Sequence, residues 1–137
     1  MYKLIIFLIF MTSSLSAIHE TIGIYHHPDY GDILTDNRGI TLYTSRNDKI
    51  NESTCYDLCL VNFRPYNIQY GQVRAPEGFF GSLTAIKRKD NQRQVAYNGK
   101  PLYTYIEDKI PGDVNGQGFD NQWFIISFYP PEESNGE

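Results

Sequence analysis

A twelve-residue motif occurs twice in this chain of 137 residues, once at residues 39–50 and again at residues 99–110. Both copies read G-x-x-L-Y-T-x-x-x-D-K-I, and every fixed position in the second copy follows its counterpart by sixty residues. Self-similarity at a constant offset indicates an internal duplication. Each half would have roughly 50–60 residues, and a unit of that size is marginal alone because it buries too little apolar surface. We therefore expect the two halves to share one hydrophobic core.

The composition around the two motifs favours β-structure. Tyr and Phe contribute 11 and 8 residues, and such side chains suit the half-buried surface of a pleated sheet, while Gly and Pro mark the turns. The predicted fold class is all-β, with two pseudo-repeats that form one small antiparallel sandwich or barrel-like domain. That single domain would span residues 18–129, with the repeats at residues 30–70 and 82–128.

Turn residues divide both halves into short strands. In the first half, residues 32–35 and 40–44 are predicted to pair around a turn at residues 36–39. In the second half, residues 82–88 and 93–97 form a hairpin, and Asn98-Gly99 then turns the chain into the second motif strand. A turn of helix is expected around residues 55–60.

Two further stretches carry specific expectations about burial. The basic run Lys87-Arg88-Lys89 is interpreted as a solvated loop beside a turn. Residues 122–129 are apolar on both faces of an extended chain, so we predict a central strand that is buried on both sides.

The ends of the chain have the features of an exported protein. Residues 1–17 combine Lys3, an apolar run and small residues, which is typical of a cleaved signal peptide. The apolar run is too short to cross a bilayer and is not followed by a Cys that a lipid could modify. We therefore expect a secreted protein with no stable membrane anchor after signal cleavage, and a disordered tail at residues 130–137. The formal net charge of −4 argues against a nucleic-acid partner.

Cys55 and Cys59 are the two cysteines of the chain. In an exported protein such a close pair favours a disulfide, which would stabilise the fold by only about 2 kcal/mol because the closed loop is short. Its expected role is to pin a local turn, and a redox-active pair is the alternative. Asn51-Glu52-Ser53 matches the acceptor pattern for N-glycosylation, which would place Asn51 in an exposed loop.

Two segments carry side chains that suit a metal ion. His26, His27 and Asp29 lie together in the sequence, but adjacent histidines on a strand point to opposite faces, which argues against one shared ion. The second segment resembles the start of a calcium loop, although Phe124 stands where the twelve-residue loop needs a bidentate Glu. Its candidate ligands are Asp108, Asp113, Asn115 and Asp120. The simpler interpretation is a turn closed by its own side chains, and no cofactor is predicted.

The order of these motifs resembles a known family, the secreted repeat of unknown function, over residues 30–128. The matching residues are Thr41-Leu42-Tyr43 with Asp48, Pro101-Leu102-Tyr103 with Asp108, Cys55 and Cys59 before Phe63 and Pro65, Gln94 to Gly99, Pro111-Gly112-Asp113 with Gly116-Gln117-Gly118, and Trp123-Phe124. Two features depart from the family: the chain has no Cys for a lipid anchor, and Phe63 stands where Trp is usual. The resemblance implies an exported protein and brings no established activity.

The paired motif residues Tyr43/Asp48 and Tyr103/Asp108 admit two interpretations. Two carboxylates that flank a cleft can catalyse glycoside hydrolysis. A motif repeated after each strand also fits a structural corner, in which Asp caps the turn and Tyr buries its ring. We favour the structural or binding role for these four residues and for Trp123.

The sequence therefore predicts a secreted, non-catalytic module for binding or surface structure. The expected partner is an extracellular protein or a glycan of unknown identity. The alternative is an extracytoplasmic redox or metal-handling accessory protein that uses Cys55 and Cys59 or the carboxylate loop. No recognisable catalytic constellation supports an enzyme, since the three histidines lie near the N-terminus, away from any Ser or Cys nucleophile.

Overall fold

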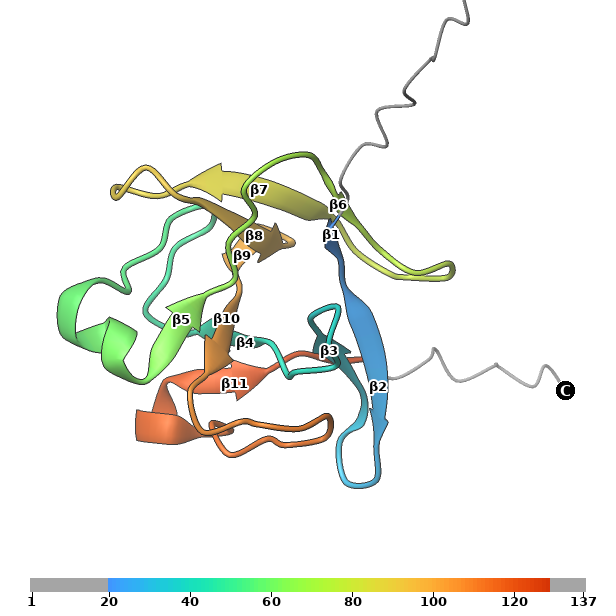
Figure 1. The fold of residues 1–137 in the computed structure, drawn as a ribbon. Coiled ribbons are helices and arrows are strands. Elements are labelled where there is room, and N and C mark those ends of the chain that lie inside the picture. Colours follow the sequence, from blue (N-terminus) through green and yellow to red (C-terminus); the bar gives the residue numbers. More distant parts are fainter. Residues whose placement is uncertain (1–19, 129–137) are drawn as a thin grey trace, which may run out of the picture.

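The computed structural model describes residues 20–128 (Figure 1), so the predicted leader at residues 1–17 and tail at residues 130–137 lie outside the described part. This part is all-β, as predicted, and its helices are limited to two short 3-10 helices. The elements are β1 (Glu20–Thr21), β2 (Gly23–His27), β3 (Gly31–Thr35), β4 (Tyr43–Ser45), η1 (Asp57–Val61), β5 (Phe63–Pro65), β6 (Val73–Arg74), β7 (Leu83–Lys87), β8 (Arg93–Tyr97), β9 (Lys100–Pro101), β10 (Tyr103–Tyr105), η2 (Phe119–Asn121), β11 (Trp123–Ile125) and β12 (Ser127–Phe128).

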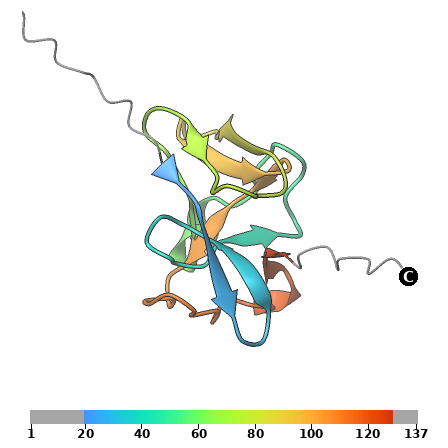
Figure 2. The ribbon, with the colours of Figure 1, turned by 90° about the vertical axis from the view of Figure 1, so that its right-hand side faces the viewer.

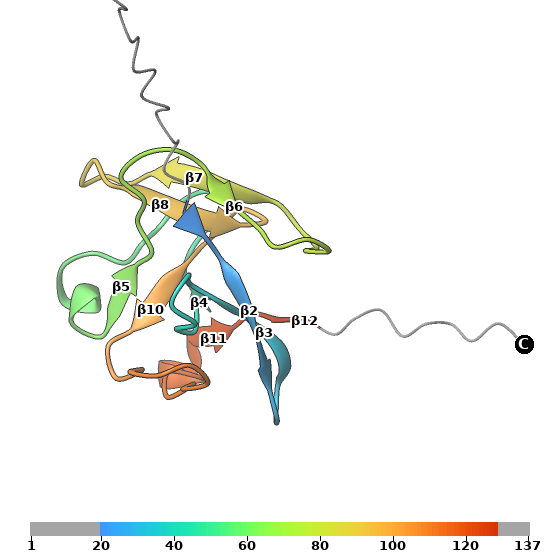
Figure 3. The same cartoon turned by 45° about the vertical axis from the view of Figure 1, so that its right-hand side comes forward.

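Three antiparallel sheets carry the fold, in the strand orders β11-β4-β10-β5, β12-β3-β2 and β7-β8-β9. A fourth, parallel pair joins β1 to β6, which the predicted antiparallel fold did not include. Within residues 20–128 none of the sheets closes into a barrel, and their packing is compatible with the predicted sandwich. In Figures 2 and 3 the β7–β8 and β2–β3 hairpins lie at opposite ends of the molecule, with the four-stranded sheet between them.

The four-stranded sheet pairs each half of the chain with the other. The two motif strands β4 and β10 lie side by side, with Tyr43 directly opposite Tyr103. Strand β5 of the first half continues the sheet on β10 of the second half. Strand β11 of the second half pairs with β4 of the first half. Neither half can therefore complete this sheet with its own strands.

The predicted turn at Asn98-Gly99 is confirmed. Tyr97 pairs with Lys100 across it, so the hairpin loop has two residues. Both loop residues have a positive φ, 48° for Asn98 and 78° for Gly99, which is the type I′ geometry that matches the twist of the flanking strands.

The first predicted hairpin forms only beside its turn. Asp36 accepts hydrogen bonds from the backbone N–H groups of Arg38 and Ile40, and a single bridge joins Thr35 to Thr41. The predicted strand over residues 40–44 becomes a regular strand only at Tyr43, because from there the chain leaves β3 and pairs with β10 and β11.

Two expectations about burial were wrong. Residues 122–129 do not form one central strand: β11 lies at the edge of the four-stranded sheet, and β12 pairs with β3 in another sheet. Ile126 lies between them, where its carbonyl accepts the N–H of Leu34. The run at residues 87–89 is not a solvated loop throughout, because Arg88 is buried, with 3% of its surface exposed.

The buried apolar side chains form two clusters. The aliphatic cluster contains Ile22, Leu34, Leu42, Ile68, Val95 and Leu102. The aromatic cluster contains Tyr43, Cys55, Phe63, Tyr103 and Trp123. The motif Leu and Tyr are consecutive, and successive residues of an extended chain point to opposite faces. Each copy of the motif therefore contributes its Leu to the aliphatic cluster and its Tyr to the aromatic cluster.

Candidate functional site

The four motif residues Tyr43, Asp48, Tyr103 and Asp108 form two hydrogen-bonded pairs, and both pairs cross between the halves. The Tyr43 hydroxyl donates to Asp108 Oδ2 at 2.6 Å, and the Tyr103 hydroxyl donates to Asp48 Oδ2 at 2.7 Å. Each Asp follows one Tyr by five residues, yet binds the other Tyr. We call this reciprocal arrangement the Tyr–Asp lock.

Both rings of the Tyr–Asp lock are fully buried, with 0% of Tyr43 and of Tyr103 exposed. Burial raises the pKa of the Tyr43 hydroxyl, and the hydrogen bond and negative charge of Asp108 raise it further. Burial also raises the pKa of Tyr103; the hydrogen bond from Ser53 partly offsets this, while Asp48 adds to it. Both hydroxyls therefore stay protonated at neutral pH and act as donors to the carboxylates.

Each carboxylate of the lock also closes the loop that follows its strand. Asp108 Oδ1 accepts the backbone N–H of Asn115 at 2.9 Å. Asp48 Oδ1 accepts the N–H and the hydroxyl of Thr54, each at 2.8 Å. One oxygen of each carboxylate therefore accepts a hydrogen bond from the backbone of the following turn, as predicted. The other oxygen binds the tyrosine of the opposite half.

Asp108 is the more buried of the two carboxylates, with 7% of its surface exposed. Burial raises the pKa of the Asp108 carboxyl above its ordinary value, although the hydrogen bonds from Tyr43 and Asn115 oppose this shift. Gly116 lies against the same pair: its N–H donates to the Tyr43 hydroxyl at 3.2 Å. A Cβ at this position would stand 3.1 Å from the Tyr43 ring.

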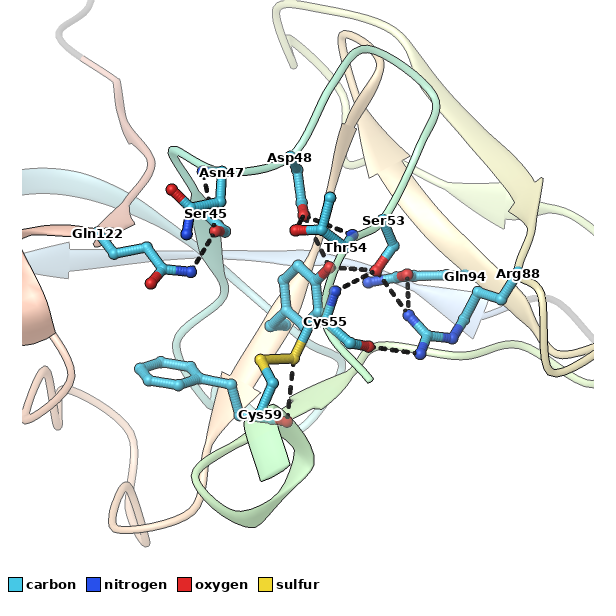
Figure 4. Close-up of a disulfide and its surroundings, with 12 residues drawn as sticks. Ser45, Asn47, Asp48, Ser53, Thr54, Cys55, Cys59, Arg88, Gln94 and Gln122 are labelled. Carbon is cyan, nitrogen blue, oxygen red and sulfur yellow. Dashed lines mark hydrogen bonds between the residues drawn. A yellow bond between two sulfur atoms is a disulfide. The ribbon is translucent and has the colours of Figure 1, made fainter. Parts of the chain in front are cut away.

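A buried cation extends the lock on the Asp48 side (Figure 4). Arg88 Nη1 donates to Ser53 Oγ at 2.8 Å, and Ser53 Oγ lies 2.5 Å from the Tyr103 hydroxyl. Because Arg can only donate and a carboxylate can only accept, the proton order is fixed. Arg88 donates to Ser53, Ser53 to Tyr103, and Tyr103 to Asp48. A positive group and a negative group thus terminate one polarised chain.

The other Arg88 contacts tie three segments together. Its guanidinium donates to Gln94 Oε1 at 2.9 Å and to the carbonyl of Cys55 at 2.8 Å, and it lies 4.4 Å from the centre of the Tyr56 ring. Gln94 in turn donates to the carbonyl of Leu102 at 2.8 Å. The side chain of Arg88 is 0% exposed and pairs with the partly exposed Asp90, so this cation anchors the η1 loop to the β7–β8 hairpin.

The aromatic rings around the lock make contacts both across the halves and within them. Phe63 and Trp123 follow η1 and η2, and their rings stack at 3.8 Å with an angle of 4° between the planes. The Tyr103 ring meets Trp123 edge-on, and the Tyr43 ring meets Phe63 in the same way. Rings in such contact contribute about 0.5–1.5 kcal/mol per pair beyond the area they bury.

The predicted disulfide is confirmed: Cys55 and Cys59 are bonded, with their Cα atoms 5.3 Å apart. Cys55 is 2% exposed, and Cys59 lies in the middle of η1, where the helical turn was expected. In the second half, Phe119 stands sixty residues after Cys59 and packs against the aromatic cluster. A ring therefore occupies the position that the disulfide has in the first half.

The candidate metal ligands either accept hydrogen bonds from their own loop or lie apart from one another. One oxygen of Asp113 accepts the N–H groups of Lys109 and Ile110. The two oxygens of Asp108 accept hydrogen bonds from the Tyr43 hydroxyl and the Asn115 N–H. Asp120 is exposed and lies in η2 with φ 51°. Among the described residues, no group of three or more His, Cys, Asp or Glu side chains could hold a metal ion. His26 and His27 have different partners, Asp32 and the Asp29 backbone.

The two residues that define the glycosylation pattern, Asn51 and Ser53, differ in their exposure to solvent. Asn51 is exposed and has φ 60°, whereas Ser53 is 4% exposed and belongs to the polarised chain. Modification of Asn51 remains a prediction. The buried contacts of Ser53 and Arg88 could not be predicted, because their partners are 33 to 50 positions away in the chain. The role of Gln94 was not predicted either, since it depends on the inward turn of Arg88.

The second half of the chain is similar to a known family. Residues 84–127 match the family model described as a secreted repeat of unknown function. No curated protein and no solved structure matches the chain. In the part that the structure describes, no helix is both long and apolar enough to span a membrane. The matched segment holds Tyr103, Asp108 and Trp123. It confirms the predicted secretion, and it confirms the predicted resemblance over residues 84–127 of the expected residues 30–128.

Proposed function

We propose that this protein is a secreted, non-catalytic module whose Tyr–Asp motif holds two duplicated halves together so that the surface can serve binding. The observation that carries the proposal is the exchange of partners, Tyr43 with Asp108 and Tyr103 with Asp48. Such exchange is what a duplicated unit needs when neither copy can bury its own sheet.

The chemistry of the motif supports a structural role. A carboxylate that acts as an acid, base or nucleophile must reach a substrate atom within hydrogen-bond distance. Asp108 is 7% exposed, and each of its oxygens already accepts a hydrogen bond. The tyrosines are fully buried and their pKa values are raised, which disfavours a phenolate nucleophile.

The disulfide fits the same interpretation. Cys55 lies in the aromatic cluster beside Phe63 and Trp123, and a reactive thiol pair needs access for the attacking thiolate. The Cys55–Cys59 bond instead holds η1 at the end of the loop that Arg88 anchors.

Removing single hydroxyls tests this proposal. Tyr43→Phe and Tyr103→Phe each keep the buried ring and delete one donor to a carboxylate. Each should lower the free energy of unfolding by about 1–3 kcal/mol, because a buried polar group loses its partner. Tyr70→Phe is the matched control: Tyr70 is 69% exposed, so its change should stay within about 0.5 kcal/mol. Urea unfolding of the three variants, monitored by the fluorescence of Trp123, measures these free energies. Wild-type stability in both buried variants would refute the structural role.

A further inference from the structure

A groove of about 420 Å³ lies on the described surface, away from the Tyr–Asp lock. Its lining residues are Ile24, Asp32, Pro76, Glu77, Gly78, Phe79, Phe80 and Phe128. One wall is the β6–β7 connection, which projects past the upper end of β2 in Figure 1. The other wall is one face of the β12-β3-β2 sheet, since Asp32 stands opposite both His26 and Phe128 in the register and cross-strand neighbours share a face.

The interior of the groove is aromatic and open to solvent. Phe79 packs edge-on against Phe128 at 5.5 Å between ring centres and against Tyr97 at 5.7 Å. Phe80 beside it is 64% exposed, and Ile24 on the facing strand is 40% exposed. Exposed apolar side chains that gather in one hollow mark a binding surface more often than scattered ones do.

The charged groups that line the groove are both negative. Asp32 and Glu77 lie on opposite walls, and no Lys or Arg is among the lining residues. His26 Nδ1 lies 2.8 Å from Asp32 Oδ1, so this carboxylate has one partner already. The exposed Glu77 carboxylate has no hydrogen bond or ion pair among residues 20–128 and sits beside Gly78 at the tip of the connection.

We propose that the groove binds a basic, apolar peptide segment of a partner protein, with an aromatic or aliphatic side chain on the Phe79–Phe80 floor and a Lys or Arg at Glu77. This inference rests on the proposed binding function. Charge complementarity selects the occupant, because an anionic lipid or nucleic acid would be repelled by both walls. The chain's own residues 129–137 carry three Glu and no Lys or Arg, so the same repulsion disfavours them.

The probe for this proposal is an acetylated, amidated Lys-Leu-Phe-Lys tetrapeptide, with Glu-Leu-Phe-Glu as its charge-reversed control. Titration of the ¹⁵N-labelled mature chain should shift the amide resonances of residues 24, 32, 77–80 and 128. Binding of the basic peptide should weaken as salt rises, because exposed charges are screened. The acidic peptide should bind at least ten-fold more weakly.

Three variants locate the contact. Phe80→Ala should lower the affinity for the basic peptide at least five-fold. The fold should persist in this variant because Phe80 is largely exposed. Glu77→Gln should lower the same affinity about two- to five-fold, as expected for the loss of one exposed ion pair. Glu107→Gln removes an exposed carboxylate outside the groove and should leave the affinity unchanged.

Several results would overturn the proposal. These are equal binding of the two peptides, shifts centred elsewhere, or preferential binding of a neutral oligosaccharide such as cellotetraose at the same amides. A chain ending at Phe128 that binds the basic peptide more than ten-fold better would assign the groove to the tail. Each of these leaves the unfolding free energies of the tyrosine variants untouched, so failure here is distinct from failure of the structural role.

Discussion

At the scale of single residues, the lock depends on buried donors that each find an acceptor. Arg88 is the least expected member, because its sequence neighbours are exposed and basic. A buried cation is tolerated only when its N–H groups find acceptors, and here Ser53, Gln94 and the Cys55 carbonyl provide them. The sequence run alone could not distinguish Arg88 from Lys87 and Lys89, since nothing local marks which side chain turns inward.

Truncation of Arg88 should therefore lower the free energy of unfolding far more than truncation of its neighbour Lys87. Arg88→Ala leaves three buried acceptors and the Asp90 carboxylate without their donor. It should lower the free energy of unfolding by about 2–4 kcal/mol. Lys87→Ala, at an exposed position of the same hairpin, should change it by less than about 0.5 kcal/mol. Chemical denaturation of the two variants measures this difference, and equal effects would contradict the anchoring role of Arg88.

The burial of Asp108 predicts a pH dependence. Burial raises the pKa of its carboxyl in the folded chain above the ordinary value of 3.8, so the folded state binds more protons than the unfolded state between the two pKa values. The stability contributed by this group is thus fully present below pH 3.8 and is lost as the pH rises through the folded pKa.

Asp108→Asn lacks this titration and provides the reference. The unfolding free energy of the native chain minus that of Asp108→Asn should decrease as the pH rises from about 3 through the folded pKa, and then stay constant. Urea unfolding of both proteins from pH 3 to pH 7 measures it. A difference that grows with pH would mean that the hydrogen bonds from Tyr43 and Asn115 outweigh burial.

At the scale of the elements, the two halves reach the same arrangement with different turns. Strands β2 and β7 begin sixty residues apart, at Gly23 and Leu83, whereas β3 and β8 begin at Gly31 and Arg93. The longer β7–β8 turn is compensated by the two-residue turn at Asn98-Gly99, so that the motif strands return to the constant offset. Asn-Gly was predictable because its backbone preference is local. The division of residues 122–129 between two sheets was not, because it depends on strands that lie far away in sequence.

Gly99 should be more sensitive to substitution than a glycine of equal backbone geometry. Gly99 and Gly78 both have φ 78°, but a Cβ at Gly99 would lie 2.7 Å from Ile50, whereas Gly78 faces open space. Both Ala variants incur the left-handed backbone cost of about 1–2 kcal/mol. Gly99→Ala should lose at least about 1 kcal/mol more because of the clash. Thermal unfolding compares them, and equal losses would show that Ile50 moves aside freely.

At the scale of the whole molecule, the central sheet is built from strands of both halves of the chain. Strand β5 of the first half pairs with β10 of the second, and β11 of the second half pairs with β4 of the first. Both the sheet and the Tyr–Asp lock therefore hold the halves together. The repeated motif predicted a shared core, and the aromatic-rich composition with its turn residues predicted the all-β fold class. The motif could not predict that the partners are exchanged, because a Tyr and an Asp five residues apart are equally compatible with pairing inside each half.

The most direct test of this account is a pair of double-mutant cycles on the unfolding free energy. One cycle combines Tyr43→Phe with Asp108→Asn, the pair joined across the halves, and the other combines Tyr43→Phe with Asp48→Asn, the pair within one half. The account predicts a coupling energy of about 1–2 kcal/mol in the first cycle and additivity within about 0.5 kcal/mol in the second. Coupling between Tyr43 and Asp48, with none between Tyr43 and Asp108, would contradict the exchange of partners on which the proposed role of the motif rests.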